Sequence, residues 1–220
     1  MRFTKTPDAL RKSMHLYAIT DRKFLKEGQT LADQVREAIE GGATFIQIRE
    51  KNISFDEYVR LSKEVKAVTD EYGVPFVVND DVDVALACGA DGAHVGQEDL
   101  DSGEARRKLG PNAILGVSAS SVEELLAAVE SGADYLGVGA IFPTGTKLDA
   151  DPVTYEMLKK ICEASTVPIV AIGGISKDNI LKLKGSGIDG VAIVSAIFGA
   201  DDIRKSAAEL SRLTDEVTGK

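Results

Sequence analysis

The feature that most constrains the fold is a short turn motif that recurs along the chain. A glycine followed two residues later by Asp or Thr precedes an apolar run at residues 42–45, 89–92, 132–135 and 187–190. The glycine suits the left-handed residue that ends a helix, and the polar residue suits a tight turn into a strand. Each motif therefore predicts a helix-to-strand connection, and successive motifs lie about two strand–helix units apart.

Apolar, β-branched runs alternate with segments of helical periodicity along the chain. Strands are predicted at residues 15–20, 45–49, 75–79, 92–95, 114–118, 135–138, 168–172 and 190–195. Helices are predicted at residues 31–40, 55–72, 82–88, 103–109, 122–131, 155–164, 177–184 and 201–213. Because strands that alternate with helices pair in parallel through right-handed crossovers, eight such units favour a single-domain α/β fold, the closed (β/α)8 TIM barrel. An open doubly wound sheet is the alternative.

Length and composition fit one domain with metabolic chemistry. The chain has 220 residues, of which 44% are hydrophobic, and a formal net charge of −9 at pH 7. We expect an irregular N-terminal lead-in at 1–13, a barrel domain at 14–215 and a C-terminal tail at 216–220. The negative charge and the lack of a long apolar run predict a cytoplasmic protein without nucleic-acid or membrane partners. The sequence leaves the oligomeric state open, a homo-oligomer included.

The second predicted strand ends in a run of polar residues. In a strand, Gln47, Arg49 and Lys51 point to one face, while Ile46 and Ile48 point to the other. Two cationic side chains on one face repel each other unless an anion lies between them, and a diphosphate would pair with both. This face therefore predicts an anion site, with ordinary solvated surface charge as the alternative.

Other polar residues fall at the carboxyl ends of strands, where barrel enzymes build their sites. Asp80 and Asp99 follow successive predicted strands. Adjacent strands lie about 4.8 Å apart, so both carboxylates can reach one Mg²⁺ ion. The alternative role is a helix N-cap for Asp80 and a turn residue for Asp99. We expect His94 to face the barrel interior as a packed or hydrogen-bonded side chain rather than as a catalytic base.

Two segments rich in glycine and serine follow the last two predicted strands. Residues 173–176 and 194–196 match the phosphate site common in barrels, where backbone N–H groups hold a phosphoryl group. A turn without a ligand is the alternative. Residues 142–147 form a hydroxyl-rich segment that ends in Lys147 and could fold over a bound anion as a lid, with a solvated loop as the alternative.

Together these motifs resemble the thiamine phosphate synthase family across roughly residues 15–212. The matching segments are 16–21, 47–51, 78–80, 94–99, 116–118, 143–147, 171–175 and 194–195. The family joins 4-amino-2-methyl-5-(hydroxymethyl)pyrimidine diphosphate to a thiazole phosphate, which forms thiamine phosphate and releases pyrophosphate. The resemblance therefore implies a TIM-barrel transferase that acts on these two small molecules with Mg²⁺ as cofactor. One departure is Val194, where isoleucine is more often expected.

The resemblance also implies a role for each site residue. Catalysis is assigned to Arg49, Lys51, Ser118 and Lys147. Substrate binding is assigned to Gln47, Ile48, Arg49, Glu50, Lys51, Asn79, Ser118, Thr144, Gly145, Thr146, Lys147, Gly174, Val194 and Ser195. Mg²⁺ binding is assigned to Asp80 and Asp99. In this scheme the pyrimidine diphosphate is held by Gln47, Arg49, Lys51, Ser118 and Lys147, with Asn79 in contact with the pyrimidine. The thiazole phosphate is held by Thr144, Thr146, Gly174, Val194 and Ser195.

Three other functions fit parts of the same pattern. A thiazole tautomerase, a close relative, would need only the thiazole phosphate site. A noncatalytic barrel would bind a phosphometabolite without turnover, and a more distant barrel enzyme would use another phosphorylated substrate. The transferase is the main prediction because the chain also carries the diphosphate and metal residues. The expected reaction is a dissociative substitution, in which the protein supplies electrostatics and positioning.

Overall fold

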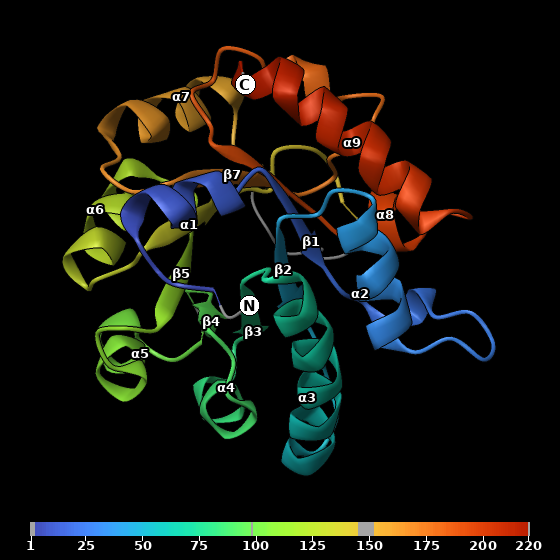
Figure 1. Ribbon diagram of the computed structural model, residues 1–220. Helices are drawn as coiled ribbons and strands as arrows, with labels where there is room; N and C mark the ends of the chain where they lie inside the picture. The colour runs from blue at the N-terminus through green and yellow to red at the C-terminus, as the bar shows by residue number, and fades with distance from the viewer. Residues whose placement is uncertain (1–2, 98, 145–151, 220) are drawn as a thin grey trace.

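Eight parallel strands form a closed barrel at the centre of the molecule (Figure 1). The computed structural model describes residues 3–97, 99–144 and 152–219. The strands are β1 (Leu16–Ile19), β2 (Phe45–Ile48), β3 (Phe76–Asn79), β4 (Gly92–Val95), β5 (Ile114–Ala119), β6 (Tyr135–Val138), β7 (Ile169–Ile172) and β8 (Gly190–Ile193). They pair in chain order, and β8 pairs with β1 to close the barrel. The prediction of a (β/α)8 TIM barrel is confirmed.

Helices surround the barrel (Figure 1). They are α1 (Pro7–Ser13), α2 (Leu31–Glu40), α3 (Phe55–Tyr72), α4 (Val82–Cys88), α5 (Ser102–Leu109), α6 (Val122–Glu130), α7 (Tyr155–Ala164), α8 (Ser195–Phe198) and α9 (Ile203–Thr218), with 3-10 helices η1 (Arg22–Phe24) and η2 (Ile180–Leu183). Side-chain caps define several starts: Ser54 accepts the N–H of Glu57 at α3, and Ser121 accepts that of Glu124 at α6. The predicted bounds of α2, α3, α4 and α7 agree with the structure.

The last third of the chain differs from the predicted helices. The expected helix at 177–184 is only the short η2, because residues 176–179 form a turn in which the Asn179 side chain accepts the Ser176 N–H and donates to the Gly174 carbonyl. The end of the predicted strand at 190–195 instead begins α8. Helix α9 continues to Thr218, so the expected tail at 216–220 is wrong for residues 216–218.

Side chains of each strand alternate between the barrel interior and the surrounding helices. Tyr17, Phe45 and Tyr135 fill the interior, with ring centroids of Phe45 4.5 Å from Tyr17 and 5.5 Å from Tyr135. Leu16 and Ala18, their neighbours along β1, belong instead to the larger apolar cluster that includes the helices. The barrel interior is therefore a packed core, and a ligand can enter only at an end.

The expectation of an irregular lead-in at 1–13 is wrong for residues 7–13, which form α1. Thr6 caps this helix and Pro7 begins it, a favourable combination for a helix start. Leu10 and Met14 are buried and pack with the interior aromatic side chains. Helix α1, dark blue in Figure 1, therefore closes the amino-terminal end of the barrel and leaves the other end for a site.

The recurring turn motif has a structural role that its spacing alone does not reveal. Asp91, Asp134 and Asp189 each accept a backbone N–H from the start of the preceding strand, at Phe76, Leu115 and Ile169. Thr44 does the same through its hydroxyl for Leu16. The motif therefore joins neighbouring strands at the amino-terminal end of the barrel.

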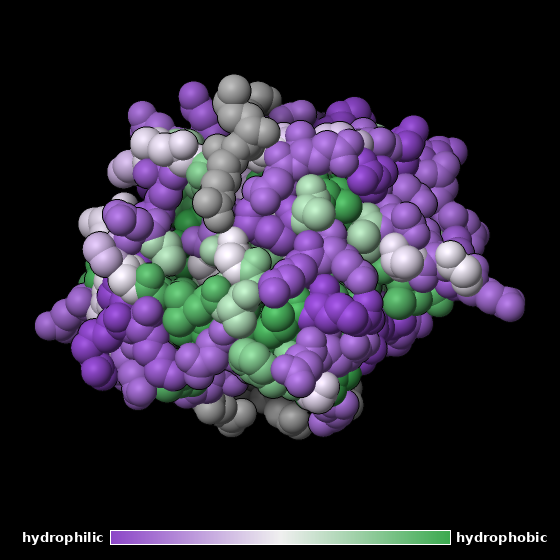
Figure 2. Space-filling model, turned by 60° about the horizontal axis from the view of Figure 1, so that its bottom comes forward, coloured by the Kyte–Doolittle hydropathy of each residue, from purple (hydrophilic) through white to green (hydrophobic). Residues whose placement is uncertain are grey.

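The exposed hydrophobic side chains of the described residues do not gather on one face of the molecule. The large exposed hydrophobic side chains are Phe55, Tyr72, Leu86, Leu126 and Leu181. They are spread over α3, α4, α6 and η2, and the face in Figure 2 is largely hydrophilic with hydrophobic residues in its middle. Within the described residues, none of the helices combines the length and the apolar character that crossing a membrane would need.

Candidate active site

A cavity of about 490 Å³ opens among the carboxyl ends of the strands. The predicted site residues that line it are Gln47, Arg49, Lys51, Asn79, Asp80, Asp99, Ser118, Thr144, Gly174, Val194 and Ser195. They come from β2, β3 and β5 or from the segments that follow β2, β3, β4, β6, β7 and β8. The structure thus brings side chains that are distant in sequence to one end of the barrel.

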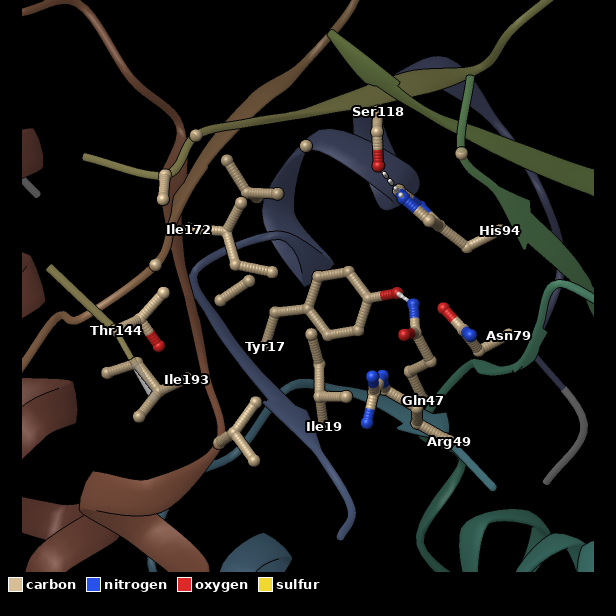
Figure 3. Close-up of a pocket in the computed structure, with 18 of the residues that line it drawn as sticks. Tyr17, Ile19, Gln47, Arg49, Asn79, His94, Ser118, Thr144, Ile172 and Ile193 are labelled. Carbon is tan, nitrogen blue, oxygen red and sulfur yellow. Dashed lines mark hydrogen bonds between the residues drawn. The ribbon is translucent and has the colours of Figure 1, made fainter. Parts of the chain in front are cut away.

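The cavity has a polar side and an apolar side (Figure 3). Arg49, Asn79 and Ser118 lie on the polar side, toward β2 to β5. Ile172 and Ile193 lie on the opposite side, toward β7 and β8. Such a cavity can hold an apolar ring against one wall while its charged groups meet donors on the other.

The cationic strand end follows the predicted alternation. Gln47 is buried, Arg49 is half-buried and Lys51 is exposed, so the three side chains rise from the interior to the rim. The Arg49 N–H donates to Thr20 Oγ1 at 3.1 Å, which ties this strand end to the end of β1. Two cationic groups therefore face one cavity, as an anion site requires.

Ile48 and Glu50 do not line the cavity, although the resemblance includes them among the substrate-binding residues. Ile48 is fully buried among the side chains between sheet and helices. The Glu50 carboxylate pairs with Arg22 Nε at 2.5 Å, and burial raises its pKa despite that partner. Both side chains point to the face of the chain opposite Arg49, so the alternation of the strand explains their position.

Asp80 and Asp99 form an acidic pair at the rim. Burial raises the pKa of Asp80, and its contact with the Asp99 carboxyl raises it further, while Lys51 acts in the opposite direction. The Lys51 Nζ lies 2.5 Å from Asp80 Oδ2. Asp80 also has a φ of 64°, a left-handed conformation that is rare for a residue other than glycine. Strain of this kind is common at functional sites.

Neighbouring aspartates take the structural roles that were the alternatives for this pair. Asp81 caps α4 by accepting the N–H of Val84, and Asp101 caps α5. Asp80 is therefore not the N-cap and faces the cavity. Asp99 keeps part of its alternative role, because its Oδ2 accepts the N–H of Gly96 at 2.7 Å.

The acidic pair fits a divalent cation on its own chemistry. Two carboxylates in contact, one of them with a raised pKa, hold more negative charge than Lys51 alone balances. Mg²⁺ binds through one or two carboxylates and takes its other ligands from water and phosphate oxygens. The described residues contain no cluster of three or more Asp, Glu, His or Cys side chains placed for a metal, so a fully protein-bound ion is not indicated there.

The opposite side of the cavity is built from backbone. Gly173 and Gly174 follow β7 with φ values of 98° and 63°. A Cβ on Gly174 would lie 2.4 Å from the Pro143 carbonyl oxygen, so only glycine fits against the segment after β6. Asn179 Nδ2 donates to the Gly174 carbonyl at 2.8 Å and holds the turn. Val194 and Ser195 complete this side at the start of α8.

Some cavity residues were absent from the predicted site. Tyr17, Ile19, Ile172 and Ile193 line its floor and apolar side. The period-two alternation of β1, which places Tyr17 and Ile19 on the interior face, is the signal that could have found the first two. His94 is buried and hydrogen-bonded to Tyr135 and Ser118, which confirms the interior position expected for it.

Three predicted residues, Gly145, Thr146 and Lys147, lie outside the described residues. Thr144, the last described residue before them, lines the cavity. The predicted catalytic and substrate contacts of this segment stay predictions.

Comparison with known proteins identifies the family. A family model described as thiamine monophosphate synthase matches residues 16–197. The chain belongs to the thiamine monophosphate synthase family. The family resemblance extends over nearly the whole chain: a Clostridium tetani protein named thiamine-phosphate synthase is 49% identical over 201 residues, which cover 91% of this chain and 96% of the relative. A relative of the same name from Pyrococcus furiosus is 47% identical over 210 residues, 96% of this chain and 99% of the relative.

A solved structure supports the same family at the level of the fold. The thiamine phosphate pyrophosphorylase of Pyrococcus furiosus superposes with a TM-score of 0.87 at 46% sequence identity. The alignment covers 94% of this chain and 98% of that one. The barrel of this thiamine monophosphate synthase family member is therefore shared with a relative over almost its full length.

Proposed function

We propose that the protein is a thiamine-phosphate synthase, a transferase that joins 4-amino-2-methyl-5-(hydroxymethyl)pyrimidine diphosphate to a thiazole phosphate or its carboxylated form. Its products are thiamine phosphate and pyrophosphate, and CO2 in addition when the carboxylated form is the substrate. Family membership over most of the chain supports this activity. The observation that carries the proposal is one cavity with a cationic, acid-paired rim on one side and a glycine turn on the other. Two phosphorylated reactants need two such sides.

The polar side suits the pyrimidine diphosphate. Arg49 and Lys51 would neutralise the diphosphate, and Lys147 would approach from the segment after Thr144. Gln47 and Asn79, both nearly buried, would hydrogen-bond the pyrimidine ring deeper in the cavity.

Asp80 and Asp99 would hold Mg²⁺ at the rim beside Lys51. When bound, Mg²⁺ supplies positive charge that neutralises diphosphate oxygens. Lys51 contacts Asp80 directly, so its ammonium group lies where the carboxylates and the diphosphate side of the cavity meet.

The other side suits the thiazole phosphate. Gly174 allows a close backbone approach, and Val194 and Ser195 begin α8 beside it. Thr144 and Thr146 would add hydroxyl donors. Ile172 and Ile193 offer an apolar wall for the thiazole ring.

The reaction at this site would be a dissociative substitution. The bond between the pyrimidine methylene carbon and the diphosphate oxygen breaks, and its electron pair leaves with pyrophosphate. The lone pair of the thiazole nitrogen then forms the new carbon–nitrogen bond. No proton has to be removed, so the residues act by positioning the reactants and stabilising the charge that develops on the leaving group.

A pyrophosphate-release assay with both precursors, with and without Mg²⁺, tests the proposal. We expect pyrophosphate and thiamine phosphate in equal amounts, and no pyrophosphate above background when Mg²⁺ is chelated. Conversion of the thiazole phosphate alone to a tautomer, without pyrophosphate release when both precursors are present, would support an isomerase instead. Binding of both precursors without turnover would identify a noncatalytic barrel.

Two variants that each remove one negative charge test whether Asp80 binds Mg²⁺. Asp80→Asn should raise the Mg²⁺ concentration needed for turnover or abolish turnover, whereas Asp83→Asn should behave like the parent protein. Asp83 is only three residues away but is exposed on α4 and pairs with Lys108. An unchanged Mg²⁺ dependence in Asp80→Asn would refute the assigned metal site.

A further inference from the structure

A continuous chain of hydrogen bonds crosses the barrel interior at the base of the cavity. Figure 3 shows its two ends, the bond between Gln47 and Tyr17 and the bond between His94 and Ser118. Gln47 Nε2 donates to the Tyr17 hydroxyl at 2.5 Å, and the hydroxyls of Tyr17 and Tyr135 lie 2.8 Å apart. The Tyr135 hydroxyl lies 3.0 Å from His94 Nδ1, and His94 Nε2 lies 3.0 Å from Ser118 Oγ. This relay links Gln47 on β2 to Ser118 on β5, and both side chains line the cavity.

Two glycines leave the space that the relay occupies. Gly116 on β5 is in register with His94 on β4 and with Tyr135 on β6. A Cβ at this position would lie 2.3 Å from the Tyr135 hydroxyl and 2.5 Å from His94 Nδ1. A Cβ on Gly137 would lie 3.3 Å from His94 Cε1. The two bulky side chains can meet across β5 only because the strand between them carries no side chain there.

Both tyrosines keep their protons. Tyr17 and Tyr135 are buried, and burial raises the pKa of each hydroxyl above its ordinary value. Each hydroxyl therefore has one proton to donate and an oxygen that can accept.

The donor at the start of the relay sets its direction. The nitrogen of the Gln47 amide only donates, so the Tyr17 oxygen accepts, which leaves the Tyr17 proton available to Tyr135. Tyr135 then donates its own proton to His94 Nδ1. An imidazole that accepts at Nδ1 carries its proton at Nε2, so His94 donates to Ser118 Oγ. That arrangement leaves the proton of Ser118, which lines the cavity, available to a ligand.

We propose that this relay holds His94 as the neutral Nε2–H tautomer and thereby orients the Ser118 hydroxyl as a hydrogen-bond donor toward the substrate. The proposal rests on the proposed function, in which Ser118 contacts the pyrimidine diphosphate. His94 and Tyr135 are positioning residues, since they act through Ser118. The substrate group that faces Ser118 is then an acceptor, either a ring nitrogen or a diphosphate oxygen.

Imidazole ¹⁵N NMR of the full chain tests the tautomer without any substrate. The chain has only two histidines, and a His15→Gln variant assigns the remaining signals to His94. We expect the Nε2–H pattern at neutral pH. An Nδ1–H tautomer or a doubly protonated ring would overturn the proposal. Because this measurement needs no turnover, it decides the relay even if the protein releases no pyrophosphate.

A pair of tyrosine variants tests what holds the tautomer. Tyr135→Phe removes the donor to Nδ1 and keeps the ring, so His94 should lose its single-tautomer pattern. Tyr58→Phe is the matched control: the Tyr58 hydroxyl is also buried, but it donates to the carbonyls of Ile48 and Asn79 outside the relay. A His94 spectrum that is unchanged in Tyr135→Phe would overturn the proposal, as would equal changes in both variants.

A double-mutant cycle tests whether the relay acts through Ser118. We expect Tyr135→Phe to lower kcat/KM by about 3- to 10-fold in the parent protein, the effect of one hydrogen bond. In a Ser118→Ala background the same substitution should have almost no effect. An equal loss in both backgrounds would show a merely structural role and contradict the proposal.

Two ligands identify the acceptor that Ser118 meets. Weaker inhibition of Ser118→Ala by pyrophosphate would place a diphosphate oxygen there. Weaker binding of the hydroxymethylpyrimidine without its diphosphate would place a ring nitrogen there. Either result supports a donor role for Ser118, and unchanged affinity for both ligands would refute it.

Discussion

Adjacent aspartates of this protein differ in role because their surroundings differ. Asp80 lies in the cavity with a raised pKa, Asp81 caps α4, and Asp83 pairs with Lys108 on the surface. The residue type is the same in all three cases. Burial and contact with Asp99 raise the pKa of Asp80, because both make its negative charge unfavourable in the folded protein.

Asp80→Asn is expected to stabilise the fold at neutral pH. A raised pKa means that the folded state favours the protonated carboxyl, so this group's contribution to stability is full below the unfolded pKa of about 3.9 and is lost as pH rises through the folded value. The asparagine variant should therefore have the higher unfolding midpoint at pH 7.5, and the difference should narrow toward pH 4. Thermal unfolding across this range checks it. A variant that is less stable at pH 7.5 would contradict the prediction.

Arg49→Ala is expected to lower the rate of bond breaking by about 10²- to 10³-fold, the usual cost of removing a group that stabilises developing charge. Arg49 lines the cavity, so its guanidinium should act on the leaving pyrophosphate. Single-turnover kinetics measure this step directly. Arg36→Ala serves as the control, because Arg36 pairs with Glu71 on the outer surface. A near-normal single-turnover rate in Arg49→Ala would remove Arg49 from the mechanism.

At the scale of elements, the connections before the strands stabilise the barrel, and the connections after the strands form the cavity. The turns into the strands carry Asp91, Asp134 and Asp189, which accept backbone N–H groups at the start of neighbouring strands. The segments after the strands carry the cavity residues. The sequence repeat therefore marks the stabilising end of the barrel, and the residues that do not repeat mark the reactive end.

Asp134→Ala is expected to lower the free energy of unfolding by about 2 to 3 kcal/mol, since it leaves partly buried donors without an acceptor. Asp134 contacts Lys5 at 2.7 Å, Arg106 at 2.6 Å and the Leu115 N–H at 2.8 Å. Asp134→Asn keeps an oxygen that can accept the Leu115 N–H, so its free energy of unfolding should fall by less than that of Asp134→Ala. Urea unfolding of the two variants measures the difference. Equal stability of Asp134→Ala and the parent protein would refute a role for this turn.

At the scale of the whole molecule, the barrel has one closed end and one open end. Helix α1 covers the amino-terminal end with Leu10 and Met14, and Lys5 and Arg11 attach the same segment to Asp134 and Asp189. The cavity lies at the other end. Stability and chemistry are thus separated along the barrel axis, which lets the site vary without loss of the fold.

Leu10→Ala is expected to cost about 2 to 4 kcal/mol of stability, as for other buried leucines. Leu10 is 3% exposed and packs in the interior cluster. Because the substitution lies at the closed end, the KM for both substrates should stay unchanged in the folded enzyme. Denaturant unfolding and steady-state kinetics check the two parts. Leu126→Ala, at a 57% exposed position, should change stability by less than about 0.5 kcal/mol, and a similar loss in both variants would contradict the prediction.

The sequence predicted most of the fold because strand alternation, helix caps and the turn motif are short-range signals. It missed α1, since a single turn or two of helix with one buried leucine has little periodicity. It also overestimated the length of η2, which begins only after the turn that Asn179 holds at 176–179. For the site, the rule that barrel sites form at the carboxyl ends of strands was enough to gather eleven of the predicted residues around one cavity.

The order of residues by itself determined the eight-unit barrel, the end at which a site forms and the alternation that aims Gln47, Arg49 and Lys51 together, because each depends on neighbours along the chain. Only the tertiary structure decided which aspartate faces the cavity and that Glu50 turns to Arg22. It also decided that Tyr17, Tyr135 and His94 meet across Gly116. These outcomes depend on contacts between strands that are far apart in the sequence, and closure of the barrel is what brings them within hydrogen-bonding distance.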